Sequence, residues 1–252
     1  MSKPKAASRP FLSAIGQIAI VIGIVLVTKT VAAETYYVPS GSMQPTLLIG
    51  DDLVVSKFSY GYSGYSLPLA VGPLWHGRLF GRLPARGDVV VFRLPRDPSV
   101  NYVKRVVGLP GDSVQMRDGR LWINGEMLPV RRDGSGPVEM EDGATVVAPR
   151  AIETLPGGRE HPIFKLAGIG DLDNTELFEV PPGHIFVMGD NRDDSADSRL
   201  SPQAGGVGMV PLENLVGRVD VVLGSWDLGV AGDPVWTWPS GLRLSRFFSR
   251  VH

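Results

Sequence analysis

The sequence predicts a mainly β fold, in which one N-terminal transmembrane helix precedes an exported domain of antiparallel β-sheet with a smaller β/loop subdomain inserted into it. Three observations support this fold class. A single long apolar run lies near the N-terminus, many short β-rich runs follow it, and no stretch after residue 34 shows a sustained 3.6-residue periodicity. Glycine and proline, at 31 and 21 of the 252 residues, indicate many tight turns.

Composition excludes several classes of protein. The 25 basic and 26 acidic side chains leave a formal charge of −1, so no basic surplus exists to neutralise the phosphates of a nucleic acid. No nucleic-acid partner is therefore expected. The chain has no cysteine, which excludes a disulfide scaffold, zinc fingers, iron–sulfur clusters and a cysteine nucleophile.

The N-terminal segment has the charge and hydropathy pattern of a membrane helix. Basic residues within 1–10 precede an apolar run from Phe11 to Val27, which lies at the short end of the about 17–25 residues that span a bilayer. The positive-inside rule makes residues 1–10 a cytoplasmic basic tail, residues 11–28 a transmembrane anchor and the remainder exported. Val31-Ala32-Ala33 also resembles the cleavage site of a secretory signal peptide, so the segment alone leaves a cleaved signal as the alternative.

The exported part is predicted to consist of short strands and turns. Residues 34–129 and 179–225 form the two parts of the main β domain, and their β-rich runs are bounded mostly by Gly, Pro or Asp. Asp118-Gly119 and Asn124-Gly125 favour hairpins because these residue types tolerate a positive φ. Residues 130–178 are polar and glycine-rich, which indicates an inserted subdomain of loops and strands, and residues 226–252 form a C-terminal segment. The β-rich runs are 53–55, 89–92, 113–117, 121–123, 185–188 and 219–222.

The first of three motifs with candidate chemistry is the turn from Pro39 to Leu47, Pro-Ser-Gly-Ser-Met-Gln-Pro-Thr-Leu. A serine nucleophile needs a base, and histidine is the usual one. The four histidines of the chain lie in scattered contexts, and no Gly-x-Ser-x-Gly elbow is present. A Ser-His-Asp triad therefore has weak support, which leaves a plain turn or a serine activated by a neutral lysine.

The second motif, from Tyr102 to Asp112, contains a candidate lysine. On a strand, Lys104 would point to one face while Val103 and Arg105 point to the other. A general-base lysine must be largely neutral near pH 7, so its pKa must fall from about 10.4 by roughly three units, or about 4 kcal/mol. Burial among the neighbouring valines can supply that desolvation, and a solvated lysine on an edge strand is the alternative.

The third motif, from Gly189 to Arg199, reads Gly-Asp-Asn-Arg-Asp-Asp-Ser-Ala-Asp-Ser-Arg and follows a predicted strand. Its four aspartates and two arginines are consistent with a solvated charged loop. A calcium loop is a second interpretation, but the arginines and the missing terminal glutamate do not suit the EF-hand pattern. The sequence therefore predicts no metal site.

Taken together, the three motifs resemble those of the bacterial type I signal peptidases, or leader peptidases. The blocks Pro-Ser-Gly-Ser-Met-x-Pro-Thr-Leu, Lys-Arg-x-x-Gly-x-Pro-Gly-Asp and Gly-Asp-Asn-Arg-Asp-x-Ser-x-Asp-Ser-Arg occur in the family's order, and Gly50-Asp51 follows the first block. The resemblance covers most of residues 10–130 and 180–225. It implies an uncleaved single-pass anchor in the bacterial inner membrane, with a cytoplasmic N-terminus and a catalytic domain on the periplasmic side.

The resemblance also implies a role for each matching residue. Ser42 would be the nucleophile, Lys104 the general base, and Ser195 would hydrogen-bond the lysine amine. The Ser40 hydroxyl and the Ser42 backbone N–H would form the oxyanion hole. No metal or organic cofactor is implied. The supporting ion pair would be Asp197 with Arg199, and the shallow apolar pockets for small substrate residues would be lined by Val38, Leu47, Tyr102 and Val103.

The implied activity is that of a membrane-bound serine endopeptidase that removes N-terminal signal peptides from exported preproteins through an acyl-enzyme. The alternatives are a related Ser/Lys processing peptidase of a specialised secretion or conjugation system, and a non-catalytic membrane-anchored scaffold. Two departures from the family pattern are Asp194, where many members have asparagine, and the stretch from Leu200 to Met209, which is longer and richer in glycine.

Two further segments suit a location at the membrane surface. Residues 60–80 are rich in tyrosine and leucine with few charges, and residues 236–252 interleave apolar and aromatic side chains with Arg243, Arg246 and Arg250. Such mixtures suit an interfacial segment on anionic lipid. Ordinary packing against the β domain is an equally supported alternative.

Overall fold

The structure is a computed structural model that describes residues 16–23, 33–66, 77–140, 143–166, 170–232 and 234–252. Residues 16–23 are helical. The rest of the predicted 11–28 anchor and the predicted tail, residues 1–10, lie outside the described residues. Among the described residues, no helix combines the length and the hydropathy needed to cross a membrane.

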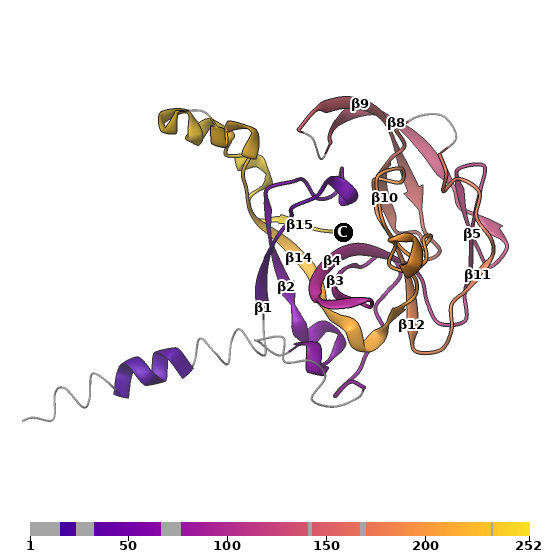
Figure 1. The fold of residues 1–252 in the computed structure, drawn as a ribbon, viewed down its shortest axis with the longest axis horizontal. Coiled ribbons are helices and arrows are strands. Elements are labelled where there is room, and N and C mark those ends of the chain that lie inside the picture. Colours follow the sequence, from indigo (N-terminus) through magenta and orange to yellow (C-terminus); the bar gives the residue numbers. More distant parts are fainter. Residues whose placement is uncertain (1–15, 24–32, 67–76, 141–142, 167–169, 233) are drawn as a thin grey trace, which may run out of the picture.

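The largest sheet has eight strands in the order β1-β2-β14-β3-β4-β12-β13, with β15 pairing with β14 (Figure 1). All of these neighbouring strands are antiparallel, which confirms the predicted antiparallel β-sheet. Its strands are β1 (Ala33–Tyr37), β2 (Asp51–Ser56), β3 (Val89–Leu94), β4 (Asp97–Gly108), β12 (His184–Met188), β13 (Val210–Pro211), β14 (Leu215–Ser225) and β15 (Ser249–Arg250).

Two smaller antiparallel sheets complete the β structure. One has the order β11-β5-β6-β7 and the other the order β10-β9-β8. Asp118 and Asn124 have φ angles of 48° and 53°, so both predicted turns adopt the positive φ that Asp and Asn tolerate. These strands are β5 (Ser113–Arg117), β6 (Arg120–Ile123), β7 (Glu126–Met127), β8 (Val130–Glu139), β9 (Thr145–Thr154), β10 (Glu160–Phe164) and β11 (Phe178–Glu179).

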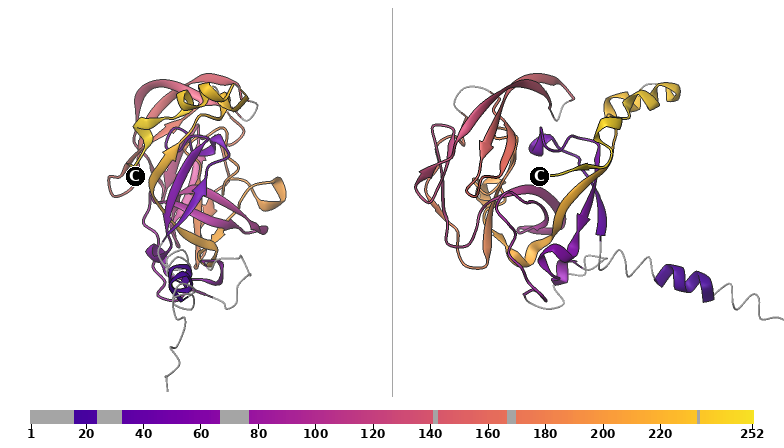
Figure 2. Two further views of the ribbon diagram at one scale, coloured as in Figure 1. Left: turned by 90° about the vertical axis from the view of Figure 1, so that its left-hand side faces the viewer. Right: turned by 180° about the vertical axis from the view of Figure 1, so that it is seen from behind.

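The helical elements after residue 33 that the structure describes are all short 3₁₀ turns, in agreement with the missing 3.6-residue periodicity. The three at the C-terminal end project from the β14 side of the molecule, away from β5 and β11 (Figure 2). The 3₁₀ turns of the described residues are η1 (Gly41–Met43), η2 (Lys57–Tyr60), η3 (Gly64–Ser66), η4 (Pro202–Ala204), η5 (Leu212–Asn214), η6 (Leu228–Gly232), η7 (Val235–Gly241) and η8 (Leu244–Arg246), and the last three are those at the C-terminal end.

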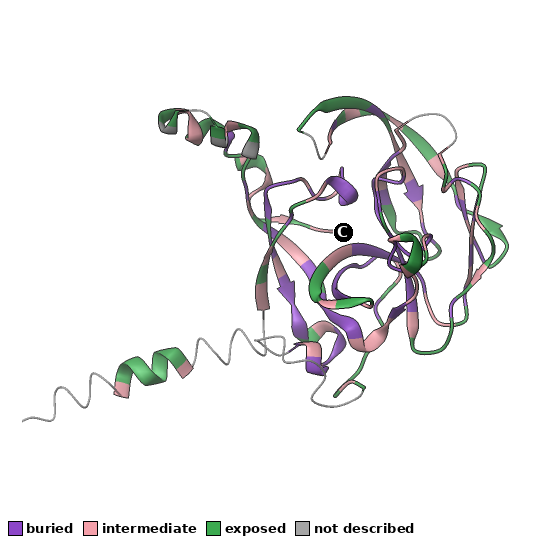
Figure 3. Ribbon diagram, in the orientation of Figure 1, coloured by how far each residue is buried: buried purple, intermediate pink, exposed green. Residues whose placement is uncertain are grey.

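Strand β4 brings the three motifs together. It pairs with β12, whose end continues into the third motif, and its residues 104–108 are all buried (Figure 3). The turn η1, which follows β1, packs against β4 through Met43 in the same apolar cluster as Val103. Both faces of this half of β4 are therefore covered by protein, which is why Lys104 and its neighbour Arg105 are both buried despite pointing to opposite faces.

Candidate active site

The Ser42 hydroxyl and the Lys104 amine meet at the turn η1. Lys104 Nζ lies 2.6 Å from Ser42 Oγ and 3.1 Å from the carbonyl oxygen of Val103. The two side chains come from positions 62 residues apart, and both are buried, with relative exposures of 9% for Ser42 and 3% for Lys104. The two motifs thus place a hydroxyl and an amine in direct contact at a site with little access to water.

The backbone of the third motif holds the Ser42 turn from the other side. The Asn191 N–H donates to the Ser42 carbonyl oxygen at 3.1 Å, and the Asn191 side-chain amide donates to the Gly41 carbonyl oxygen at 3.4 Å. Gly189 lies so close that a Cβ there would come within 2.4 Å of the same Ser42 oxygen. Any side chain at position 189 would therefore clash with the Ser42 backbone and with Ser195.

Burial changes the protonation of the lysine. Desolvation by burial lowers the pKa of Lys104 to about 8. The carboxylates of Asp197, Asp190 and Asp194 act in the opposite direction and raise this pKa, but desolvation is the larger effect. At this pKa about one tenth of the amines are neutral at pH 7, and the neutral fraction rises with pH. A neutral amine at hydrogen-bond distance from a hydroxyl can accept its proton, so the geometry supports a general base.

The two other serines predicted at the site, Ser40 and Ser195, form no hydrogen bond with the Lys104 amine. The Ser40 hydroxyl lies 3.4 Å from Ser42 Oγ, on the rim of the same site. Ser195 Oγ is buried and has no hydrogen-bond partner among the described residues, so the implied Ser195–Lys104 hydrogen bond is not formed here. Its hydroxyl lies beside Gly189, where a Cβ would meet it at 2.3 Å.

A pocket of about 380 Å³ opens at the Ser42–Lys104 pair. Tyr102 and Val103 line it, as the sequence predicts, and the Lys104 amine lies 5.3 Å from the centroid of the Tyr102 ring. Val38 and Leu47 are instead buried in the apolar cluster beneath the turn, and a contact of either with substrate stays a prediction. The other lining residues are Pro39, Ser40, Val100, Asn101, Asp194 and Ala196.

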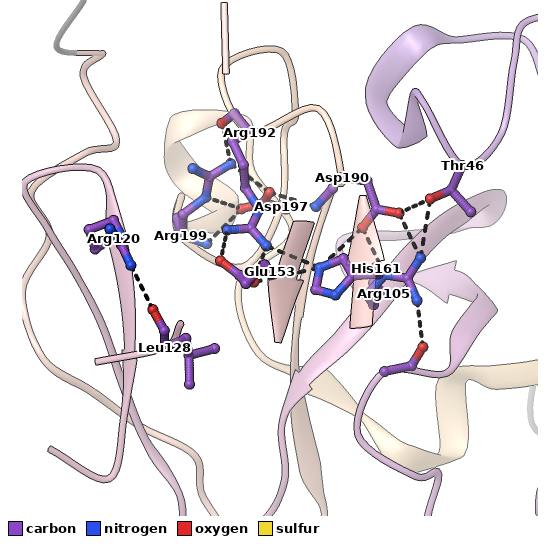
Figure 4. Close-up of polar contacts among 12 residues, drawn as sticks. Thr46, Arg105, Arg120, Leu128, Glu153, His161, Asp190, Arg192, Asp197 and Arg199 are labelled. Atoms are coloured by element: carbon purple, nitrogen blue, oxygen red, sulfur yellow. Dashed lines mark hydrogen bonds and ion pairs between the residues drawn. The ribbon is translucent and has the colours of Figure 1, made fainter. Parts of the chain in front are cut away.

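A buried ion pair lies next to the site. Arg105 binds Asp190 through two hydrogen bonds of 2.8 and 2.7 Å, and both side chains are almost fully buried (Figure 4). Thr46 donates to the same carboxylate, which ties the serine turn to the third motif. Burial raises the pKa of Asp190, but the Arg105 guanidinium outweighs it and holds the pKa below its usual range. The pair is therefore charged, and it joins β4, the serine turn and the loop after β12.

The smaller sheet β8–β10 contributes the second half of this network. Arg192 forms a two-point contact with Glu153 at 2.8 and 2.5 Å, and His161 Nε2 lies 3.5 Å from the Glu153 carboxylate (Figure 4). Burial lowers the pKa of His161 to about 4, so this ring is neutral at pH 7. Sequence reasoning missed Glu153 and His161, because neither belongs to a motif and their shared partner Arg192 lies 39 and 31 positions away.

The predicted ion pair between Asp197 and Arg199 is formed. Its two hydrogen bonds measure 2.9 and 2.8 Å, and both side chains are buried. Asp197 also accepts the Gly189 N–H at 3.0 Å, and Arg199 donates to the Arg192 carbonyl oxygen at 2.7 Å. The pair thereby shapes the loop that supports Ser42, and it does not touch the serine hydroxyl or the lysine amine.

The serine hydroxyl against a buried lysine amine, on an antiparallel β fold, defines the arrangement of a serine–lysine peptidase. Comparison with known families agrees. The model of the family "Signal peptidase, peptidase S26" matches residues 11–226, and the chain belongs to this family.

Individual relatives are similar over nearly the whole chain. Signal peptidase I of Rickettsia typhi (strain ATCC VR-144 / Wilmington) is 40% identical over 248 residues, which cover 92% of this chain and 90% of that protein. Signal peptidase I of Rickettsia prowazekii (strain Madrid E) is 40% identical over 253 residues, which cover 94% and 92%. A solved signal peptidase I from Enterococcus faecalis V583 shares 24% identity over 55% of this chain and 97% of that chain, with a TM-score of 0.32, too slight a likeness to carry an argument.

Proposed function

We propose that this chain removes N-terminal signal peptides from exported preproteins, with Ser42 as the nucleophile and Lys104 as the general base. The observation that carries the assignment is the 2.6 Å distance between Lys104 Nζ and Ser42 Oγ in a buried setting. Family membership and the names of the Rickettsia relatives support the substrate class. The lowered pKa of Lys104 supports its role as the base.

The reaction proceeds in two halves. Neutral Lys104 takes the proton of Ser42 Oγ as the oxygen attacks the scissile carbonyl, and the Ser40 hydroxyl and Ser42 N–H stabilise the charge on the carbonyl oxygen. The C–N bond then breaks, and the Lys104 ammonium protonates the leaving amine of the mature protein. Lys104 next activates a water molecule, which hydrolyses the ester on Ser42 and releases the signal peptide.

The pocket beside Ser42 is expected to take small side chains before the cleaved bond, as the family resemblance implies. A peptide with an Ala-x-Ala sequence should be cut after the second alanine, with Tyr102 and Val103 lining the pocket that receives it. Replacing that alanine by tryptophan should lower kcat/KM by about 10²-fold or more. Mass spectrometry of the products tests this, and equal cleavage of both peptides would contradict the assignment.

The rate is expected to rise with pH through about 8, because only the neutral form of Lys104 acts as a base. Asp194 raises the pKa of Lys104, so Asp194→Asn should move this acid limb to lower pH and raise activity at pH 7. The profile of kcat/KM against pH is the measurement, with Asp171→Asn as the control because Asp171 is exposed and does not contribute to the Lys104 shift. An acid limb that stays in place or moves to higher pH in Asp194→Asn would count against Lys104 as the base.

We also propose that residues 11–28 anchor the chain in the bacterial inner membrane, with the catalytic domain on the periplasmic side. The C-terminal segment supports a second contact with lipid, since Trp236, Leu244 and Phe248 are 79%, 70% and 71% exposed. The sequence predicts that Arg243 and Arg246 face anionic lipid, but both bind the protein itself. Arg243 donates to the Ile49 carbonyl oxygen, and Arg246 binds the Asp51 carboxylate. The apolar side chains therefore carry this proposal.

The lipid contact can be tested with a chain that starts at Ala33. It should bind vesicles that contain phosphatidylglycerol, and the double variant Trp236→Ser/Phe248→Ser should bind at least fivefold more weakly, because each change removes apolar area from the interface. Point variants are preferable to deletion, since deletion would also remove Arg246 from Asp51. Val147→Ser, which changes an equally exposed valine on β9, is the control. Equal binding by the double variant and the control would refute the contact.

A further inference from the structure

Gln44 makes a paired contact with the last residue of β8. Its side-chain Nε2 donates to the Glu139 carbonyl oxygen at 2.8 Å, and the Glu139 N–H donates to its Oε1 at 3.0 Å. The Gln44 side chain is almost fully buried. One amide side chain thus satisfies both main-chain groups of Glu139, as a neighbouring strand would.

The pairing of β8 explains why these groups are available. Glu139 lies opposite Thr145 on β9, and the next hydrogen bond of this hairpin joins the Met140 N–H to the Ala144 carbonyl oxygen. Main-chain groups in an antiparallel pair alternate between facing the partner strand and facing away from it. Among the described strands, β8 is an edge strand of its sheet, so the groups of Glu139 that face away from β9 meet the side chain of Gln44.

This contact lies against the turn that carries the nucleophile. The Gln44 N–H donates to the Gly41 carbonyl oxygen at 3.0 Å. A Cβ on Gly41 would meet Gln44 Nε2 at 2.3 Å and the Glu139 carbonyl oxygen at 2.9 Å, so no free space separates the turn from the pairing. Ser42 lies between these two positions of the chain, and a movement of β8 would therefore move its hydroxyl relative to Lys104.

We propose that Gln44 is a positioning residue, through which the edge strand β8 of the smaller sheet fixes the Ser42 turn against Lys104. The inference rests on the proposed peptidase function and assigns a role in it to the inserted subdomain. A displacement of about 1 Å between reacting groups can lower a rate by up to about 10²-fold. Residues 101–104 of β4, which line the pocket, are held by pairing with β3 and not by Gln44, so substrate binding should change little when Gln44 is altered.

The test replaces Gln44 by methionine, which keeps the side-chain volume and removes both hydrogen bonds. The single-turnover rate constant for preprotein cleavage, with enzyme in excess, should fall about tenfold while the half-saturating enzyme concentration changes less than twofold. A lower fraction of folded enzyme would not change this rate constant. Hydrogen exchange at the Glu139 amide should become at least tenfold faster, because its acceptor is lost.

Two more variants complete the design. Glu139→Pro deletes the N–H that Gln44 accepts while leaving the Met140–Ala144 hydrogen bond of the hairpin, and should reproduce the tenfold loss. Gln115→Met on β5, the matched control, removes the hydrogen bond that Gln115 donates to the Thr175 carbonyl oxygen and the one it accepts from Arg117, and should leave the rate unchanged. A Gln44→Met rate constant within twofold of wild type would overturn the positioning role alone. A wild-type chain that cleaves no preprotein would overturn the proposed function and this inference with it.

Discussion

Lys104→Ala is expected to lower kcat for preprotein cleavage by about 10⁴-fold, and Ser42→Ala by a similar factor. The Lys104 amine is the only basic group within hydrogen-bond distance of Ser42 Oγ among the described residues, so its removal leaves the hydroxyl without a proton acceptor. The two residues act as one unit. The double variant should therefore be no slower than either single variant, because losses from such units are not additive.

The measurement is the initial rate of preprotein cleavage over a range of substrate concentrations. Controls are Ser99→Ala and Lys165→Ala, which change an exposed serine of β4 and a lysine that pairs with Asp173 and Asp193. Both controls should retain turnover within about threefold. Substantial turnover by Lys104→Ala would contradict the assignment of Lys104 as the base. A double variant whose loss in kcat equals the product of the two single losses would contradict the claim that the two residues act as one unit.

Arg105→Ala is expected to destabilise the fold by about 3–5 kcal/mol, the second large effect. It would leave the buried Asp190 carboxylate without its guanidinium partner, and an unpaired buried charge is costly. The Arg105 side chain also donates to the Gly87 and His252 carbonyl oxygens at 2.7 and 2.8 Å, so two acceptors lose their donor as well. Urea unfolding followed by circular dichroism measures the change in the free energy of unfolding.

Two further variants separate the loss of a buried partner from the loss of any ion pair. Arg131→Ala breaks an exposed pair with Glu160, whose atoms lie 3.7 Å apart, and should cost well under about 1 kcal/mol. Arg105→Met combined with Asp190→Leu removes both charges and should recover much of the stability lost in Arg105→Ala. If Arg105→Ala proved as stable as Arg131→Ala, the buried pair would not hold the three segments together.

The sequence predicted the features of the fold that depend on neighbouring residues. The β-rich runs lie in strands, and Asp118 and Asn124 adopt the positive φ that makes their turns favourable. The contact between Ser42 and Lys104 could also be predicted, because the family's motifs assign the two residues to one active site although they lie 62 positions apart. In each case the local chemistry of the residues, or a motif, points directly to the structure.

Contacts between side chains from distant segments could not be predicted in this way. Strand β8 contains Gly134, Gly136 and Pro137 and has no apolar alternation, so its pairing with β9 and with Gln44 follows from tertiary packing. Nothing local indicates that His161 is buried against Glu153. The composition of the C-terminal segment suggested that Arg243 and Arg246 contact lipid. In the structure they bind the Ile49 carbonyl oxygen and the Asp51 carboxylate, which lie far away in the sequence.

The central claim is that a neutral amine at position 104 serves as the base for Ser42, and chemical rescue tests it most directly. Because the chain has no cysteine, Lys104→Cys would carry a single thiol that 2-bromoethylamine converts to an aminoethyl side chain of nearly lysine length. The unmodified variant should be inactive, and modification should restore preprotein cleavage, whereas capping the thiol with a methyl group should not. Activity that does not return with the amine, or that returns equally with the methyl cap, would contradict the account.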